Sequence, residues 1–207
     1  EVNKFKNRIS SCGSPNNGKV ISLIGPDGAG KTTLSKDIEN WLSYKLSSEN
    51  IFLGQVKDSK FNWVLRKISR ILRLFRLSKI SVIARDYTHI VNAGYREYAI
   101  NQCKVLSDSG YYIITDRYPL KEFWNMKIPM DGPKLPEESI FHRKEFDVYK
   151  KFPNYPDIII ILKIPIEVSI SRKPDEHNNP SIIHNISKKI EAIDNLHNLK
   201  DSIIIDA

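Results

Sequence analysis

One stretch of the chain has the residue types and the spacing that bind a phosphate chain. Residues 25–32 read Gly-Pro-Asp-Gly-Ala-Gly-Lys-Thr and complete the pattern G-x-x-x-x-G-K-[ST]. Its glycines allow the backbone to curve so that several N–H groups approach an anion closely, which a Cβ would obstruct. Lys31 would carry positive charge to the outer phosphates, and the Thr32 hydroxyl would ligate Mg²⁺. The stretch therefore predicts a site for ATP and magnesium.

The flanks of this loop favour the same interpretation. The apolar run Val20–Ile24 enters the loop as a buried strand, and residues 34–46 leave it with helical spacing. A helix in that position aims its dipole and its unpaired N–H groups at the bound anion. The residues expected to bind the nucleotide are Gly25, Pro26, Asp27, Gly28, Ala29, Gly30, Lys31, Thr32 and Thr33.

A second group of polar residues follows a later strand. Asp116-Arg117-Tyr118 comes directly after the apolar segment Tyr111–Thr115, and open α/β sheets bind ligands at the carboxyl ends of their strands. Asp116 would hold Mg²⁺ through water or orient an acceptor, and Arg117 would clamp two phosphates with its planar fork. An Asp-Arg pair alone is usually a surface ion pair, but the phosphate-binding loop favours a role in the same site.

The elements that position these residues alternate along the chain. Segments rich in β-branched residues occur at 20–24, 51–56, 111–115, 158–162 and 202–205, with helical patterns at about 31–46, 60–77, 81–108, 165–172 and 181–199. Strands this apolar are covered on both faces. We therefore predict an α/β fold, a three-layer P-loop NTPase sandwich with a parallel sheet of about five strands flanked by helices.

Composition bounds the remaining choices. The 207 residues suffice for one domain with a substantial core, which we place at 19–207 after a polar linker or N-terminal extension at 1–18. Neither cysteine has metal or redox spacing, and the sequence shows no signal peptide or membrane-spanning run. We expect a cytoplasmic protein, with an upstream domain in a longer polypeptide as an open expectation because the sequence begins at Glu1.

The formal net charge of +8 suits anionic substrates, but also nucleic acid or a membrane surface. Basic and apolar residues interleave over 60–77, which predicts an amphipathic basic helix. A solvated surface helix is the simplest interpretation, with peripheral membrane contact or protein docking as alternatives. A specific nucleic-acid partner is disfavoured because no nucleic-acid-binding motif accompanies the charge. A homodimer is compatible with the sequence.

Over residues 19–206 the chain resembles the thymidylate kinase family of P-loop nucleoside monophosphate kinases. The resemblance rests on Asp27 inside the loop, the Asp-Arg-Tyr triplet at 116–118, Arg96 at its spacing before the triplet, and the segment Pro165–Lys173 leading towards a mobile lid at about 170–185. It implies a kinase that transfers the γ-phosphoryl group of ATP to a small-molecule acceptor.

The resemblance also implies roles for single residues. Asp27 would contact the acceptor's sugar, Arg96 its base and Arg117 its phosphate, with Tyr118 beside them. Arg172 or Lys173 would reach the transferring phosphoryl group or the adenine. The residues expected to act in catalysis are Lys31, Asp116, Arg117 and Arg172, and those expected to hold magnesium are Thr32 and Asp116.

Two departures bear on the acceptor. Asn92 stands where the family has an aromatic ring that stacks on thymine, and Met130-Asp-Gly-Pro133 resembles a branch associated with bacterial surface-glycan genes. Trp124 is a further candidate for the acceptor pocket. The acceptor is then a nucleoside monophosphate such as dTMP or, alternatively, a sugar, a sugar phosphate or another glycan precursor.

The chemistry of the acceptor group also stays open. A phosphate acceptor needs no general base, whereas a hydroxyl acceptor would need Asp116 or Asp27 to receive its proton. An alternative of another class is a nucleotide-binding or regulatory module that transfers nothing. GTPase switching is disfavoured because the sequence contains no Asn-Lys-x-Asp motif.

Overall fold

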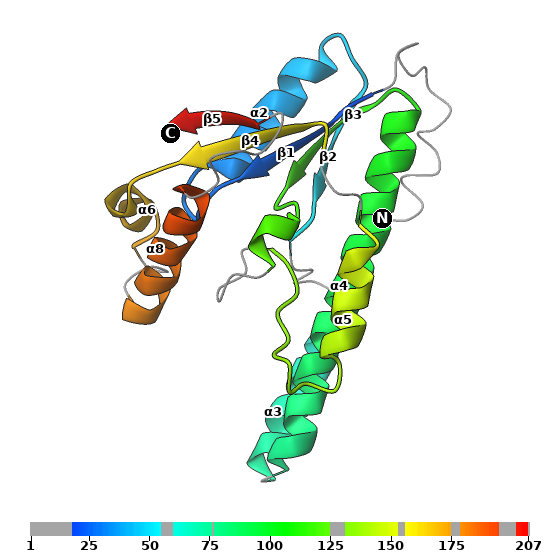
Figure 1. Ribbon diagram of the computed structural model, residues 1–207, viewed down its shortest axis with the longest axis vertical. Coiled ribbons are helices and arrows are strands. Elements are labelled where there is room, and N and C mark those ends of the chain that lie inside the picture. The colour runs from blue at the N-terminus through cyan, green and yellow to red at the C-terminus, as the bar shows by residue number, and fades with distance from the viewer. Residues whose placement is uncertain are drawn as a thin grey trace.

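The computed structural model describes the backbone of residues 18–54, 60–75, 77–124, 131–152, 156–174, 179–194 and 202–206. Five parallel strands form one sheet in the order β2-β3-β1-β4-β5 (Figure 1). The predicted α/β fold with a five-stranded parallel sheet is thus confirmed. The strands are β1 Val20–Ile24, β2 Ser48–Phe52, β3 Tyr112–Asp116, β4 Ile158–Lys163 and β5 Ser202–Asp206.

Helices connect the strands and cover both faces of the sheet. They are α2 Lys31–Ser43, α3 Lys60–Leu74, α4 Ser78–Asp108, α5 His142–Lys150, α6 Ile166–Arg172 and α8 Pro180–Asp194, with a short 3₁₀ turn η1 at Lys121–Phe123. Helix α2 packs on one face, where Leu42 meets Leu23 and Ile114. The opposite face is covered by α4 and α8, since Ile193 belongs to the same buried cluster as Ile113. Successive strand residues thus enter opposite layers, as the strand pleat requires.

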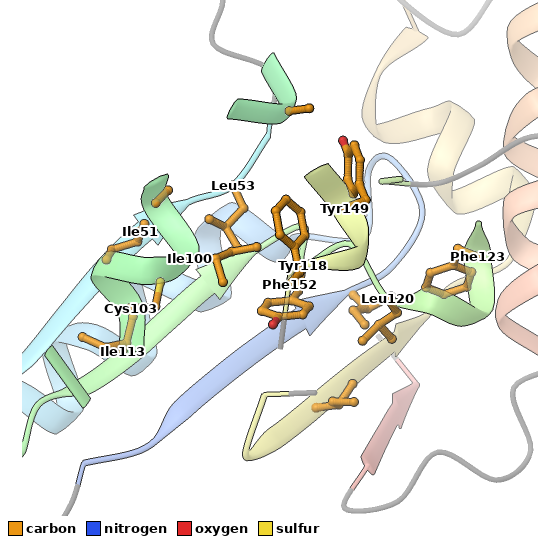
Figure 2. Close-up of a cluster of buried hydrophobic side chains, with 14 of the residues drawn as sticks. Ile51, Leu53, Ile100, Cys103, Ile113, Tyr118, Leu120, Phe123, Tyr149 and Phe152 are labelled. Carbon is orange, nitrogen blue, oxygen red and sulfur yellow. The ribbon is translucent and has the colours of Figure 1, made fainter. Parts of the chain in front are cut away.

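The larger core lies between α4, α5 and the sheet. Figure 2 shows the rings of Tyr118, Tyr149 and Phe152 gathered with Leu53 and Leu120. Tyr118, expected in the acceptor site, is only 3% exposed and packs in this core. Its position anchors the start of the segment that follows β3.

Helices α3 and α4 form an antiparallel hairpin that projects away from the sheet (Figure 1). The predicted helix over 60–77 is therefore wrong at its end, because α3 stops at Leu74 and α4 begins at Ser78. Two serines join the helices: Ser69 Oγ donates to the Ser81 carbonyl at 2.9 Å, and Ser81 Oγ donates to the Ser69 carbonyl at 2.8 Å. An exposed apolar stripe with helical spacing runs along α3, made of Val64, Ile68, Ile71 and Phe75. Membrane or protein contact there stays a prediction.

Strand β2 and helix α5 differ from the sequence prediction, and part of the predicted chain lies outside the described residues. Strand β2 begins at Ser48, not at 51, because its pairing with β3 starts with Ser48 opposite Tyr112. Helix α5 falls in a section for which no helix was predicted. The predicted linker up to residue 17 and the helix end at 195–199 lie outside the described residues. Within the described ranges, no helix is long and apolar enough to cross a membrane.

Candidate active site

The phosphate-binding loop joins β1 to α2 at the carboxyl edge of the sheet. Gly28 and Gly30 adopt left-handed backbone angles, with φ of 85° and 82°, which a residue with a Cβ adopts only under strain. A Cβ on Gly28 would also lie 3.1 Å from the Ser169 carbonyl oxygen on α6. Helix α2 begins directly after Gly30, so its first N–H groups, which have no intrahelical partner, face the loop.

The lysine of the motif is folded over the loop. Lys31 Nζ donates to the carbonyl oxygens of Gly25 at 2.9 Å and Pro26 at 2.7 Å. Burial, followed by the nearby charge of Arg117, lowers the pKa of Lys31 to about 8. The ammonium group is therefore still mostly charged at neutral pH. Phosphate oxygens could replace the two carbonyls as its partners.

Asp116 and Thr32 meet because β1 and β3 are neighbouring strands, with Leu23 opposite Asp116. Thr32 Oγ1 donates to Asp116 Oδ2 at 3.2 Å. The other oxygen, Asp116 Oδ1, is buried and has no hydrogen-bond partner in the part of the chain that the structure describes. Such an oxygen beside a hydroxyl fits a magnesium ion or a water bound to it.

A magnesium ion at this position would depend on the nucleotide for most of its ligands. Among the described residues, no group of three or more His, Cys, Asp or Glu side chains could hold a metal. Mg²⁺ in nucleotide sites is commonly held by one or two protein oxygens together with phosphates and water. The pair of Thr32 and Asp116 meets that requirement.

Asp27, inside the loop, binds two cations from different elements. Its Oδ1 accepts from Arg117 at 3.2 Å, and its Oδ2 accepts from Lys189 on α8 at 2.8 Å. Burial alone would raise the pKa of Asp27, but the charges of Lys189, Arg117 and Lys31 together hold it well below its usual range. Asp27 is thus ionised at neutral pH and binds both Arg117 and Lys189. Lys189 was not found from the sequence, because it lies inside a predicted helix and no motif marks it.

Arg117 has an unusual backbone conformation. Its φ is 72°, and it is the one non-glycine residue with positive φ among those described. Such strain in a residue with a Cβ is typical of functional positions. Its backbone N–H donates to the Leu23 carbonyl at 3.3 Å, which ties the turn to β1. The guanidinium Nε is buried without a hydrogen-bond partner among the described residues, so Arg117 retains a donor for a ligand.

Helix α6 lies against the phosphate-binding loop. Ser169 Oγ donates to the Asp27 carbonyl at 2.6 Å, and an Arg172 guanidinium nitrogen donates to the Gly28 carbonyl at 3.1 Å. Arg172 and Lys173 are both exposed at the end of this helix. Residues 175–178, in the middle of the predicted lid, lie outside the described residues. The described part of the lid region brings Arg172 to the loop.

A cavity of about 530 Å³ opens beside the loop, between the ends of β4 and β5 and helix α8. A volume of this size and a largely apolar wall with a few polar groups are typical of small-molecule sites. The lining residues are Pro26, Lys163, Ile164, Pro165, Ile190, Ile193, Asp194 and Asp206.

On the other side of the loop, Arg96 is buried, and each of its three guanidinium nitrogens donates a hydrogen bond within the chain. Its side chain is 2% exposed, and it donates to the Leu53 carbonyl at 2.7 Å, to the Tyr149 hydroxyl at 2.6 Å and to Asp131 Oδ1 at 3.1 Å. Burial raises the pKa of Asp131 although Arg96 and other cations oppose the shift. Contact between Arg96 and a base stays a prediction.

Asp131 shares a very small cavity with the two main cations of the site. This cavity measures about 10 Å³, which is close to the minimum that holds one water molecule. Asn92, one helical turn before Arg96 on α4, is half-buried and is not part of the wall. The cavity is lined by Leu23, Ile24, Gly25, Lys31, Arg117, Tyr118, Phe123 and Asp131.

The segment that carries Asp131 is fixed in place. Glu145 Oε2, on α5, accepts from the backbone N–H groups of Lys134 at 3.0 Å and Leu135 at 2.8 Å. A Cβ on Gly132 would lie 2.7 Å from the Trp124 ring. Trp124 packs edge-on against Tyr149 and does not line the small cavity. The sequence analysis identified residues 130–133 as an unusual motif but suggested no role for Asp131.

Known proteins resemble the chain at moderate identity, although no family model matches it. The uncharacterized ATP-binding protein YghS of Escherichia coli K12 is 28% identical over 177 residues, which cover 76% of this chain and 74% of that protein. A probable thymidylate kinase 1 of Saccharolobus solfataricus is 28% identical over 190 residues, covering 91% and 88%.

A solved structure agrees with these relatives at the level of the fold. The thymidylate kinase of Candida albicans superposes with a TM-score of 0.54 and 16% identity, covering 92% of this chain and 84% of that one. The phosphate-binding motif, the sheet order and the curated relatives lead to one conclusion. The chain is similar in sequence and fold to thymidylate kinase-like P-loop proteins.

Proposed function

We propose that the protein is a magnesium-dependent phosphotransferase that moves the γ-phosphoryl group of ATP to a small acceptor. The observation that carries the proposal is the contact between Thr32 and Asp116, whose second oxygen is left for a metal, beside Arg117 and Lys31. Phosphoryl transfer asks the protein mainly to align donor and acceptor and to neutralise charge. The oxygen pair of Thr32 and Asp116, the buried Lys31 and the strained Arg117 would supply those functions.

On the donor side, the loop would hold the phosphates and the 530 Å³ cavity would hold the nucleoside. Lys31 would leave its carbonyl partners for the β- and γ-phosphates, and Arg172 would reach the same group from α6. Magnesium, when bound, would neutralise charge on the phosphates. The similarity to YghS, an uncharacterized ATP-binding protein, supports the choice of nucleotide.

On the acceptor side, two classes of compound compete. Relatives named thymidylate kinase favour a nucleoside monophosphate such as dTMP. The ion pair between Arg96 and Asp131 favours a different acceptor, such as a sugar, a sugar phosphate or another glycan precursor, because the arginine is already engaged. A nucleotide-binding module that transfers nothing is the alternative of another class.

The test combines binding with transfer. Titration calorimetry with Mg-ATP should show saturable binding that Lys31→Ala weakens, and γ-labelled ATP should label one acceptor in a panel of nucleotides, nucleosides, sugars and sugar phosphates. Folded protein that does not bind Mg-ATP contradicts the proposal. Binding without transfer to any acceptor favours the regulatory module.

A further inference from the structure

We propose that Asp131 determines the acceptor class, because it closes the acceptor pocket to nucleoside monophosphates and presents its carboxylate to an acceptor hydroxyl. The inference rests on the proposed phosphotransferase function and names the substrate class of the same site. Three observations carry it: the engagement of Arg96, the fixed position of the segment around Asp131, and the size of the cavity that Asp131 lines.

The guanidinium group of Arg96 is occupied by hydrogen bonds to other residues of the chain. Each of its three donor nitrogens has a protein acceptor within 3.1 Å, namely Leu53 O, the Tyr149 hydroxyl and Asp131 Oδ1. An entering nucleobase would have to displace the carboxylate, which would leave a buried charge unpaired at a cost of several kcal/mol. Asp131 thus occupies the position on Arg96 that a ligand acceptor atom would need.

Displacing Asp131 would also be difficult mechanically. Its segment is held by Glu145 through two backbone N–H groups and by the close approach of Gly132 to Trp124. Glu145 is itself only 1% exposed. The backbone that carries the Asp131 carboxylate is therefore held in a fixed position.

The cavity between Asp131, Lys31 and Arg117 matches a hydroxyl group in size, and Asp131 supplies a hydrogen-bond acceptor. Its volume of about 10 Å³ accommodates about one water-sized group, whereas a phosphate group is several times larger. Lys31 and Arg117 line the same cavity, so its size, not its net charge, disfavours a phosphate, and the Asp131 carboxylate accepts a hydrogen bond from a hydroxyl. An alcohol reaching in from the surface therefore fits this wall better than a phosphate.

Among the carboxylates around the loop, Asp131 is the best placed to receive a proton. Asp27 has a cation on each oxygen, and Asp116 is placed for the metal. In the proposed step the acceptor oxygen forms a bond to the γ-phosphorus as the bond from that phosphorus to the β,γ-bridging oxygen breaks. ADP leaves, and the hydroxyl proton passes to Asp131 and then to water.

The test uses dTMP as the probe, in the presence of magnesium and a non-hydrolysable ATP analogue. Wild-type protein should bind the analogue but bind dTMP only weakly, with Kd on the order of 1 mM or higher. Asp131→Ala opens the cavity and frees Arg96, so its affinity for dTMP should rise at least about tenfold. Glu138→Gln, an exposed change in the same section, should leave both affinities unchanged.

A second variant keeps the test valid if Asp131→Ala does not fold. Asp131→Asn removes the charge but retains a carbonyl oxygen for Arg96, so it should fold and gain less dTMP affinity than the alanine variant. Micromolar binding of dTMP by wild-type protein would overturn the inference, as would the absence of any gain in folded Asp131 variants that bind the analogue normally. If the wild-type protein does not bind the ATP analogue at all, that result would instead contradict the proposed function.

The acceptor group is tested by product analysis with γ-labelled ATP. Pairs of compounds that differ only in a phosphate, such as free sugars against their monophosphates and thymidine against dTMP, separate the two classes. Label on a former hydroxyl, lost in Asp131→Asn at unchanged Mg-ATP affinity, supports the inference. Label added to an existing phosphate overturns it.

Discussion

The two sides that we propose for the donor and the acceptor are built in different ways. The donor side is nearly contiguous, since residues 25–33 supply the loop and the start of α2, and β3 adds Asp116. The acceptor side joins α4, the segment from 131 to 135 and α5, and Arg96 lies 35 residues from Asp131. One side relies on backbone geometry fixed by glycines, and the other on buried side-chain pairing.

This difference indicates how each side can change. A loop that binds phosphate through main-chain N–H groups tolerates few substitutions, because its glycines have left-handed φ values. A pocket made from side chains changes its ligand when one carboxylate is added. If the proposed function holds, we therefore expect relatives to share a nucleotide donor and differ in acceptor.

The largest effect should come from breaking the buried pair on the acceptor side. Arg96→Met leaves Asp131 without its cation, so unfolding free energy should fall by about 3–5 kcal/mol. Urea denaturation measures it. Lys151→Met, at the exposed pair with Glu97, is the control and should cost about 1 kcal/mol or less. Equal losses would contradict the contrast between a buried network and a surface pair.

On the donor side, Lys31→Ala should reduce phosphoryl transfer about 100- to 1000-fold, because the γ-phosphoryl group loses a positioned charge. Steady-state kinetics with labelled ATP measure the change. Lys36→Ala, an exposed lysine on the same helix, should leave the rate near that of wild type. A similar loss in both variants would mean that general surface charge matters more than the loop.

The pH dependence should separate the two sides further. The pKa of Lys31 is lowered to about 8, so its charge is present below that pH and is lost as the pH rises through it. Mg-ATP affinity of the free protein should fall about tenfold between pH 7 and pH 9. Lys31→Arg keeps its charge in this range and should bind with little pH dependence. A flat wild-type profile would contradict this interpretation.

Lys189 should give the smallest effect. Lys189→Met removes one of two cations from Asp27, which the remaining Arg117 still holds, so transfer should fall only about threefold. The lowered pKa of Asp27 stabilises the fold above its unfolded pKa near 3.8, and this stability is lost as the pH falls below that value. The variant should therefore lose less stability than wild type on acidification to pH 2, as measured by thermal melting.

Sequence patterns predicted the regular parts of the fold well. Apolar strands such as Val20–Ile24 and the glycine pattern at 25–30 are determined by neighbours in sequence, so local reasoning reaches them. The turn between α3 and α4 was predicted at 78–80 but lies at 75–77, because the basic amphipathic pattern continues through it. Helix α5 was missed because its nine residues follow a Pro-rich section.

The candidate site was predictable to the extent that motifs mark it. The loop and the triplet at 116–118 come together as expected, since β1 and β3 are neighbours. Lys189 and Asp131 carry no local signal, because a lysine in a helix and an aspartate in a loop are common. Their contacts with Asp27 and Arg96 depend on tertiary packing across 162 and 35 residues of sequence.

The resting position of Lys31 has a consequence for selectivity. Since its ammonium group already has two carbonyl partners, an incoming anion must compete with oxygens of the protein's own main chain. Singly charged ions such as chloride offer too little attraction to win that exchange, while a polyphosphate chain brings several negative oxygens at once. The loop should in this way select polyphosphates over the abundant simple salts of its surroundings.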